Sequence, residues 1–140
     1  KRLSISPTNQ LTMLLHAHSG FRYIVLSTGV IVIAYAAYGL ATKSQYGKRM
    51  RILSGIFTGV VDLTALLGLL VVIFTDNFYP QLTGHIMMMV LAVVTAHVVH
   101  GVMKRRPPEA QSFTPHLLGT LVVLACIAAG IMAIGRPIIG

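Results

Sequence analysis

The sequence predicts an all-α fold, an integral membrane four-helix bundle, from three observations. Hydrophobic residues make up 55% of the 140 residues and charged residues only 10%, which leaves too little polar surface to cover a water-soluble domain. The mean hydropathy of +0.79 agrees with this composition. The apolar residues also form four long runs, and each run is near the roughly 20 residues that a helix needs to cross a bilayer.

The four apolar runs give the predicted helices in chain order. They cover residues 18–41, 52–75, 83–103 and 116–135. Neither a soluble domain boundary nor a convincing internal repeat is evident, so we expect one membrane domain over residues 1–140. The polar stretch after Lys1 and Arg2 is not typical of a signal peptide, and we expect the first helix to stay in the mature protein.

The basic residues predict how the helices are oriented. Basic segments in membrane proteins face the cytoplasm, so we expect both termini and the loop of residues 76–82 on the non-cytoplasmic side. The formal net charge of +8 would suggest nucleic acid in a soluble protein, but topology and lipid headgroups account for it here, and we expect no nucleic-acid partner. Seven of the eleven basic residues lie in the two segments between helices one and two and between helices three and four: Lys43, Lys48, Arg49, Arg51, Lys104, Arg105 and Arg106.

Small residues predict close helix packing. Gly55 and Gly59 form a GxxxG step on the second predicted helix, a pattern that lets helix backbones approach closely within a bundle or against a partner subunit. The single cysteine, Cys126, lies in the last apolar run and is expected to be a packing residue. The fourth predicted helix carries further small residues at Gly119, Ala125, Ala128, Ala129 and Gly130.

Ionisable residues inside the predicted helices are the main functional clue, because lipid makes such groups costly. Helix direction places His16, His18, Arg22 and His85 toward the outer end of the bundle. The other histidines lie toward the inner end. The complete set of candidate binding residues is His16, His18, Arg22, Asp62, His85, His97, His100 and His116.

The histidine spacing suits haem b. His85 lies about 18 Å along the helix axis from His97 and about 22 Å from His100, and either separation suits two stacked haems. A haem b iron takes two neutral imidazoles from different helices, each oriented by a hydrogen-bond acceptor. At the outer end His85 would pair with His16 or His18. At the inner end His97 or His100 would pair with His116, although His16, His100 and His116 can also simply reach toward lipid headgroups.

Asp62 and Arg22 are the remaining candidates. Asp62 lies about 15 Å from the inner end of the second predicted helix, near the middle of the membrane. Two interpretations stay open for it: a proton relay or quinone contact, or a polar strut between helices. Arg22 suits a haem propionate, a quinone or a lipid phosphate equally well. The partners of Asp62 expected from depth alone are Arg22, His97, Thr64 and Thr95.

Several motifs together resemble a group of small bacterial four-helix membrane proteins labelled cytochrome b-like. They are the segment Leu15-His16-Ala17-His18-Ser19-Gly20-Phe21-Arg22-Tyr23, the segment Gly84-His85-Ile86-Met87-Met88, the pair Ala96-His97 and the stretch from Asp62 to Gly68. The resemblance implies a multi-pass protein of the bacterial inner membrane with haem-linked or quinone-linked electron transfer.

Two functions follow as hypotheses. The first is a b-type cytochrome-like subunit for quinone-linked electron transfer, with His85 and either His18 or His16 as iron ligands. The second is a haem-free accessory subunit of a larger respiratory or photosynthetic complex, which would pack against other integral membrane subunits and bind lipid or quinone. An electron-transfer or non-catalytic subunit is favoured over an independent enzyme, because the chain has no HExxH motif and no cysteine pair for a dedicated metal site.

Overall fold

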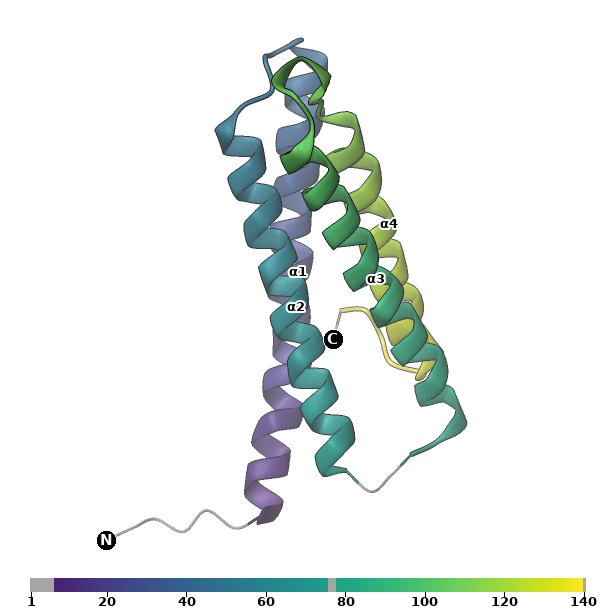
Figure 1. Ribbon diagram of the computed structural model, residues 1–140. Coiled ribbons are helices and arrows are strands. Elements are labelled where there is room, and N and C mark those ends of the chain that lie inside the picture. The colour runs from purple at the N-terminus through teal and green to yellow at the C-terminus, as the bar shows by residue number, and fades with distance from the viewer. Residues whose placement is uncertain (1–6, 76–77, 140) are drawn as a thin grey trace, which may run out of the picture.

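The computed structural model describes residues 7–75 and 78–139, and the fold is all-α (Figure 1). All four α-helices are long and apolar enough to cross a membrane. A short 3₁₀ helix, η1 (Pro108–Ala110), precedes the last α-helix. The four α-helices are α1 (Pro7–Ala41), α2 (Lys48–Phe74), α3 (Pro80–Arg105) and α4 (Thr114–Ala133).

The helices form an antiparallel ring in which each helix packs against two neighbours. Contacts join α1 to α2, α2 to α3, α3 to α4, and α4 back to α1. Residues 42–47 and 106–113 connect helices at the same end of the bundle, which we call the loop end. The opposite end, formed by the first turns of α1 and α3 and the last turns of α2 and α4, is the open end. Both basic segments therefore lie at the loop end.

The first helix is longer than the apolar run that predicted it. It begins at Pro7, well before the predicted start at residue 18. Helical hydrogen bonds run from backbone to backbone, so polar side chains continue a helix that apolar side chains began. Pro7 starts the helix well, since its fixed φ is helical and its missing N–H would have had no partner there.

The last helix is as long as predicted but lies two residues earlier, beginning at Thr114 and ending at Ala133 rather than at residue 135. Gly135 adopts a φ of 70°, which side-chain-bearing residues avoid. Its N–H donates to the carbonyl of Met132 at 2.9 Å, and the N–H of Arg136 donates to the carbonyl of Ile131 at 3.3 Å. These two bonds form a Schellman turn, which stops the helix and directs the following residues back across the open end.

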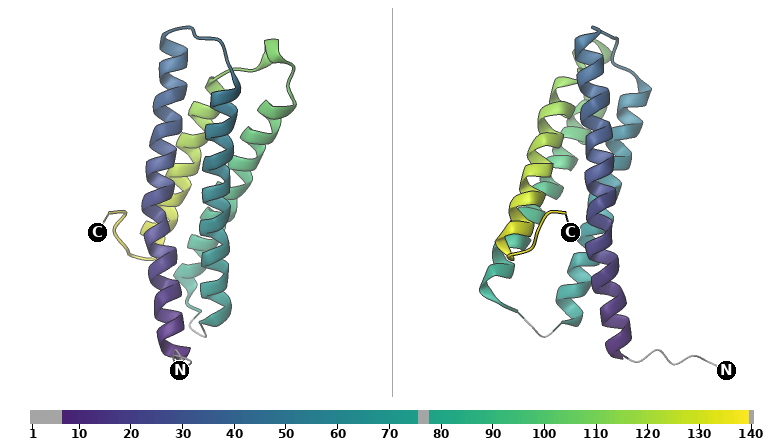
Figure 2. Two further views of the ribbon diagram at one scale, coloured as in Figure 1. Left: turned by 90° about the vertical axis from the view of Figure 1, so that its left-hand side faces the viewer. Right: turned by 180° about the vertical axis from the view of Figure 1, so that it is seen from behind.

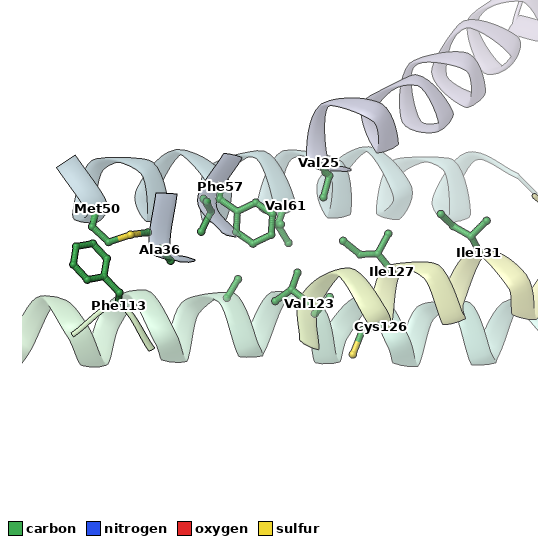
Figure 3. Close-up of a cluster of buried hydrophobic side chains, with 13 residues drawn as sticks. Val25, Ala36, Met50, Phe57, Val61, Phe113, Val123, Cys126, Ile127 and Ile131 are labelled. Atoms are coloured by element: carbon green, nitrogen blue, oxygen red, sulfur yellow. The ribbon is translucent and has the colours of Figure 1, made fainter. Parts of the chain in front are cut away.

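The hydrophobic core is concentrated at the loop-end half of the bundle (Figure 3). Among the described residues, buried side chains begin only at Val25 in α1 and at Ala92 in α3, and they stop at Val61 in α2. On α4, by contrast, they run from His116 to Ile131. The α1–α2 hairpin and the α3–α4 hairpin therefore pack tightly near the loops and diverge toward the open end (Figures 1 and 2).

Small residues bring α4 close to α3, as predicted. A Cβ built on Gly119 would clash with the side chain of Val99, and one built on Gly130 would lie 2.7 Å from the terminal methyl of Met89. The two glycines of the GxxxG step on α2 differ, since a Cβ on Gly55 would lie 3.3 Å from the ring of His100 on α3. A Cβ on Gly59 would meet nothing within 4 Å, so this glycine does not contribute to packing between the helices of one chain.

Replacing Gly119 with alanine tests the contact between α3 and α4. We expect Gly119→Ala to lower the thermal stability in detergent, because overpacking costs about 1–3 kcal/mol while the gain in helix propensity is only about 1 kcal/mol. The buried Cys126 provides the measurement, since a thiol-reactive dye labels it only on unfolding. Gly59→Ala is the matched control and should keep or raise the melting temperature. An equal melting temperature for the two variants would contradict the close contact at Gly119.

Candidate functional site

A cavity of about 530 Å³ lies at the open end between the two hairpins. Its walls are mostly apolar, and its volume falls within the range of small-molecule and cofactor sites. Residues from all four helices line it, together with the segment that follows α4. Its ionisable and aromatic polar side chains are His18, Arg22, Tyr79, His85 and Arg136.

Two histidines meet in this cavity from different helices. The ring centroids of His18 on α1 and His85 on α3 lie 6.3 Å apart, with the ring planes at 90°. His18 is therefore the outer-end histidine that the structure brings to His85. His16, the alternative considered from the sequence, is exposed.

Each of these imidazoles is held by a backbone carbonyl of the neighbouring helix. His18 Nδ1 lies 3.1 Å from the carbonyl oxygen of Thr64 on α2, and His85 Nδ1 lies 2.8 Å from that of Gly130 on α4. A carbonyl oxygen only accepts hydrogen bonds, so each Nδ1 carries the proton and donates it. In the neutral ring Nε2 then carries a lone pair, which is the form of histidine that binds a metal.

Glycines and a helix end make these carbonyls accessible. Gly68 lies one turn after Thr64, and a Cβ there would be 2.8 Å from the His18 ring. Gly130 is among the last four residues of α4, whose carbonyls lack the usual partner within a helix. His85 therefore fills a vacant position at the end of α4, and the missing side chain of Gly68 leaves room for His18.

Two arginines line the same cavity. Arg22 Nη1 donates to the carbonyl of Pro137 at 3.3 Å, and Nη2 donates to the hydroxyl of Tyr23 at 2.8 Å. The first bond ties α1 to the segment that follows α4. That segment also carries Arg136, which the turn at Gly135 brings back to the cavity. The cavity thus combines an apolar interior, two imidazoles and two guanidinium groups.

Some of these residues were not among the candidates from the sequence. The site also includes residues that are not ionisable groups inside a predicted helix, the criterion used for the candidates. These residues are Thr64, Gly68, Tyr79 and Arg136. The Gly135-Arg136-Pro137 sequence was the available signal for a helix end that turns back, because glycine after a helix followed by proline is typical of such a stop.

The loop-end histidines make other contacts. His116 is buried, and its Nε2 forms a hydrogen bond of 2.7 Å with the hydroxyl of Tyr46, whose ring stacks on it at 13°. His100 Nδ1 lies 3.3 Å from Ser54 Oγ. Over residues 7–75 and 78–139, no hydrogen bond or ring contact joins His97 or His100 to His116. An iron site at this end stays a prediction.

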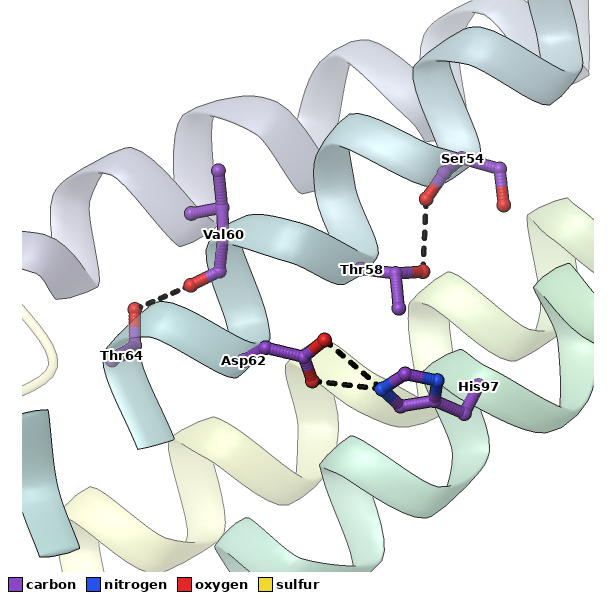
Figure 4. Close-up of polar contacts among 6 residues, drawn as sticks. All are labelled: Ser54, Thr58, Val60, Asp62, Thr64 and His97. Carbon is purple, nitrogen blue, oxygen red and sulfur yellow. Dashed lines mark hydrogen bonds and ion pairs between the residues drawn. The ribbon is translucent and has the colours of Figure 1, made fainter. Parts of the chain in front are cut away.

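Asp62 and His97 form a hydrogen-bonded pair on the outer surface of α2 and α3 (Figure 4). His97 Nε2 lies 2.8 Å from Oδ1 and 3.0 Å from Oδ2 of Asp62. The two side chains are 56% exposed for His97 and 43% exposed for Asp62. Of the four partners that depth alone allowed for Asp62, the structure brings His97 to it, and the pair does not line the cavity.

The chain matches no known protein family, curated protein or solved structure. The likeness to cytochrome b-like proteins therefore stays a prediction, and the site must be judged by its own geometry. Within the described part of the chain, no group of three or more His, Cys, Asp or Glu side chains is placed to hold a metal ion. A metal at His18 and His85 would need a cofactor that supplies its remaining ligands, as a porphyrin does.

The burial of the Tyr46 hydroxyl predicts a dependence on alkaline pH. Burial raises the pKa of the Tyr46 hydroxyl above its usual 10.0, and the nearby Arg51 acts in the opposite direction. The folded state thus holds this proton more tightly than the unfolded state, so its contribution to stability is complete below about pH 10 and is lost as the pH rises further. We expect the melting temperature of Tyr46→Phe to fall less steeply above pH 10 than that of the wild type.

The control for this measurement is Tyr38→Phe, because the Tyr38 side chain is exposed. Its melting temperature should follow the wild-type pH profile. The same profile for Tyr46→Phe and the wild type would show that burial of the Tyr46 hydroxyl does not contribute.

Proposed function

We propose that the protein is a membrane-embedded b-type cytochrome-like subunit that transfers electrons in a quinone-linked pathway. The observation that carries this proposal is the pair of imidazoles from α1 and α3 in one apolar cavity, each with Nδ1 bound to a carbonyl and Nε2 left for a metal. Haem b would supply one-electron redox chemistry, and His18 and His85 would be its iron ligands.

The spacing of the two rings supports this assignment. A metal–imidazole nitrogen bond is about 2 Å long, so two imidazoles on opposite sides of one metal ion have centroids about 6 Å apart. The centroids of His18 and His85 lie 6.3 Å apart. The perpendicular ring planes are compatible with this arrangement, since rotation about the axis through the metal leaves the bond lengths unchanged.

The rest of the cavity suits an amphipathic, acidic macrocycle. Val25, Ile127 and Ile131 give it an apolar interior. Arg22 and Arg136 line the cavity and would bind the two propionate groups, because guanidinium and carboxylate form strong, paired hydrogen bonds. The apolar side chains would exclude water from the iron, and the two arginines would neutralise the propionates.

The outer surface supports insertion into a membrane. Large apolar side chains on all four helices are exposed, including Val30, Leu69, Met87 and Leu118, whereas a water-soluble bundle carries polar residues on its outer faces. Both basic segments lie at the loop end, so this end faces the cytoplasm by the positive-inside rule. The cavity and both termini then lie on the non-cytoplasmic side. The resemblance stated above adds the bacterial inner membrane as the location.

A haem-free accessory subunit of a larger respiratory or photosynthetic complex is the second candidate. The short connections over residues 42–47 and 106–113 favour it, since they offer little surface to a soluble electron donor. Other integral membrane subunits and lipids would then be the partners, and the cavity would hold a lipid or quinone.

Spectroscopy of the purified protein tests the haem assignment. We expect a low-spin haem b signal in the reduced-minus-oxidised spectrum, with about one haem per chain by pyridine haemochrome. His18→Ala and His85→Ala should each abolish the low-spin signal, because each removes one iron ligand. His16→Ala is the matched control and should leave it unchanged, as should His116→Ala. Absence of haem from the wild type, or equal loss in all four variants, would contradict the assignment.

Arg136→Gln tests the propionate contact. A hydrogen bond to a charged group contributes about 1.5–3 kcal/mol, so we expect haem retention to weaken by about tenfold or more. The measurement is the rate of haem transfer from the purified protein to excess apomyoglobin. Arg105→Gln at the loop end is the control and should match the wild type. Unchanged transfer from Arg136→Gln would remove Arg136 from the site.

A further inference from the structure

The pair of Asp62 and His97 lies on the outer surface of two long apolar helices, with His97 in the loop-end half of α3. Asp62 is near the centre of α2, which runs from Lys48 to Phe74. With exposed fractions of 43% and 56%, both side chains face outward rather than into the core. Placing an ionisable group in hydrocarbon costs free energy, and such groups usually have a function. A ligand for an outward-facing pair in the membrane would itself have to dissolve in lipid.

The geometry of the pair defines which atom is available to that ligand. Both carboxylate oxygens of Asp62 contact His97 Nε2, and a carboxylate only accepts hydrogen bonds, so Nε2 carries a proton. In the neutral ring Nδ1 then holds a lone pair, and within the described residues it forms no hydrogen bond. A carboxylate that fixes one nitrogen of a histidine leaves the other nitrogen to accept a proton from a substrate.

Small residues keep the space beside the pair open. Gly59 lies one turn from Asp62 on α2, and Gly101 lies one turn from His97 on α3. A Cβ built on either glycine would meet nothing within 4 Å. Exposed apolar side chains, including those of Val94 and Val98, lie on either side along α3. A flat ring could therefore reach His97 along the helix surface while remaining in hydrocarbon.

We propose that Asp62 and His97 bind the headgroup of a lipid-soluble hydroquinone and that His97 Nδ1 takes up its proton. The electron half of the reaction rests on the haem proposed above. A hydroquinone fits because it is neutral, dissolves in lipid and carries a phenolic O–H that can donate a hydrogen bond to a ring nitrogen. A phosphate headgroup fits poorly, because its negative charge would face the carboxylate of Asp62.

The proton transfer is a simple heterolytic step. The phenolic O–H bond breaks, the proton goes to His97 Nδ1, and the hydroquinone becomes a monoanion. The resulting imidazolium stays paired with the Asp62 carboxylate, which stabilises its charge in the apolar surroundings. Complete oxidation of one hydroquinone to one quinone releases two protons and two electrons, and the single haem proposed above would accept the electrons one at a time, over two reduction cycles. His97 is about 18 Å along α3 from His85, so the base and the iron ligand share one helix.

Reduction of the haem by decylubiquinol tests the proposal. We expect Asp62→Asn and His97→Gln to slow it about 100-fold, the order of magnitude of general-base catalysis. Haem content and reduction by dithionite should stay unchanged. Asp62→Asn keeps an oxygen that accepts from Nε2, so folding should be preserved. Val102→Ala, at an exposed position on the same helix, is the control and should reduce at the wild-type rate. Wild-type rates for both Asp62→Asn and His97→Gln would overturn the proposal.

Photolabelling separates this proposal from the haem assignment. An azido-substituted quinone should label α2 and α3 near Asp62 and His97, and Asp62→Asn should reduce the labelling, whether or not haem is present. Labelling confined to the cavity at the open end, or to neither region, would overturn the hydroquinone site. A partner helix covering this face in the intact membrane would likewise exclude the label there and overturn it.

Discussion

The close approach of α4 to α3 is the contact on which the open end of the molecule depends. Gly119 and Gly130 leave room on α4 for the side chains of Val99 and Met89, which pack directly against the α4 backbone and let the two helices approach closely. As a result, the last carbonyls of α4 lie beside the first turns of α3, where His85 reaches one of them. The α1–α2 hairpin has no equivalent packing against this half, since its buried residues stop at Val25 and Val61. The cavity is the direct consequence of this difference.

Each hairpin contributes one imidazole together with the carbonyl that holds it. His18 on α1 binds the carbonyl of Thr64 on α2, and His85 on α3 binds that of Gly130 on α4. Orientation of each ring is therefore settled within its own hairpin, and only the distance between the rings depends on how the hairpins pack. The loop-end core fixes that distance, because it is where all four helices meet. The two ligands of the proposed haem would therefore have their rings oriented before the cofactor joins them.

The sequence predicts the helices well because a long apolar run leaves few alternatives. It does not predict the start of α1 at Pro7, since hydropathy reports the surroundings of a residue rather than its backbone hydrogen bonds. The site is harder. Placing His18 and Asp62 requires knowing how each helix is rotated, and helices that are apolar all round carry no clear moment to fix this. The contribution of Arg136 depends on the turn at Gly135, a tertiary feature that no apolar pattern records.

The two polar sites differ in which histidine nitrogen forms a hydrogen bond and in which group accepts it. In the cavity, Nδ1 is fixed by an uncharged carbonyl, so a neutral ring presents Nε2 to a mostly apolar space, where it would bind the proposed cofactor. On the outer surface, Nε2 of His97 is fixed by the Asp62 carboxylate, so Nδ1 is left for another proton, whose charge the carboxylate would balance. The carbonyl offers no such balance to His18 or His85. A carbonyl acceptor thus suits His18 and His85 to the proposed metal. A carboxylate acceptor suits His97 to the proposed proton donor.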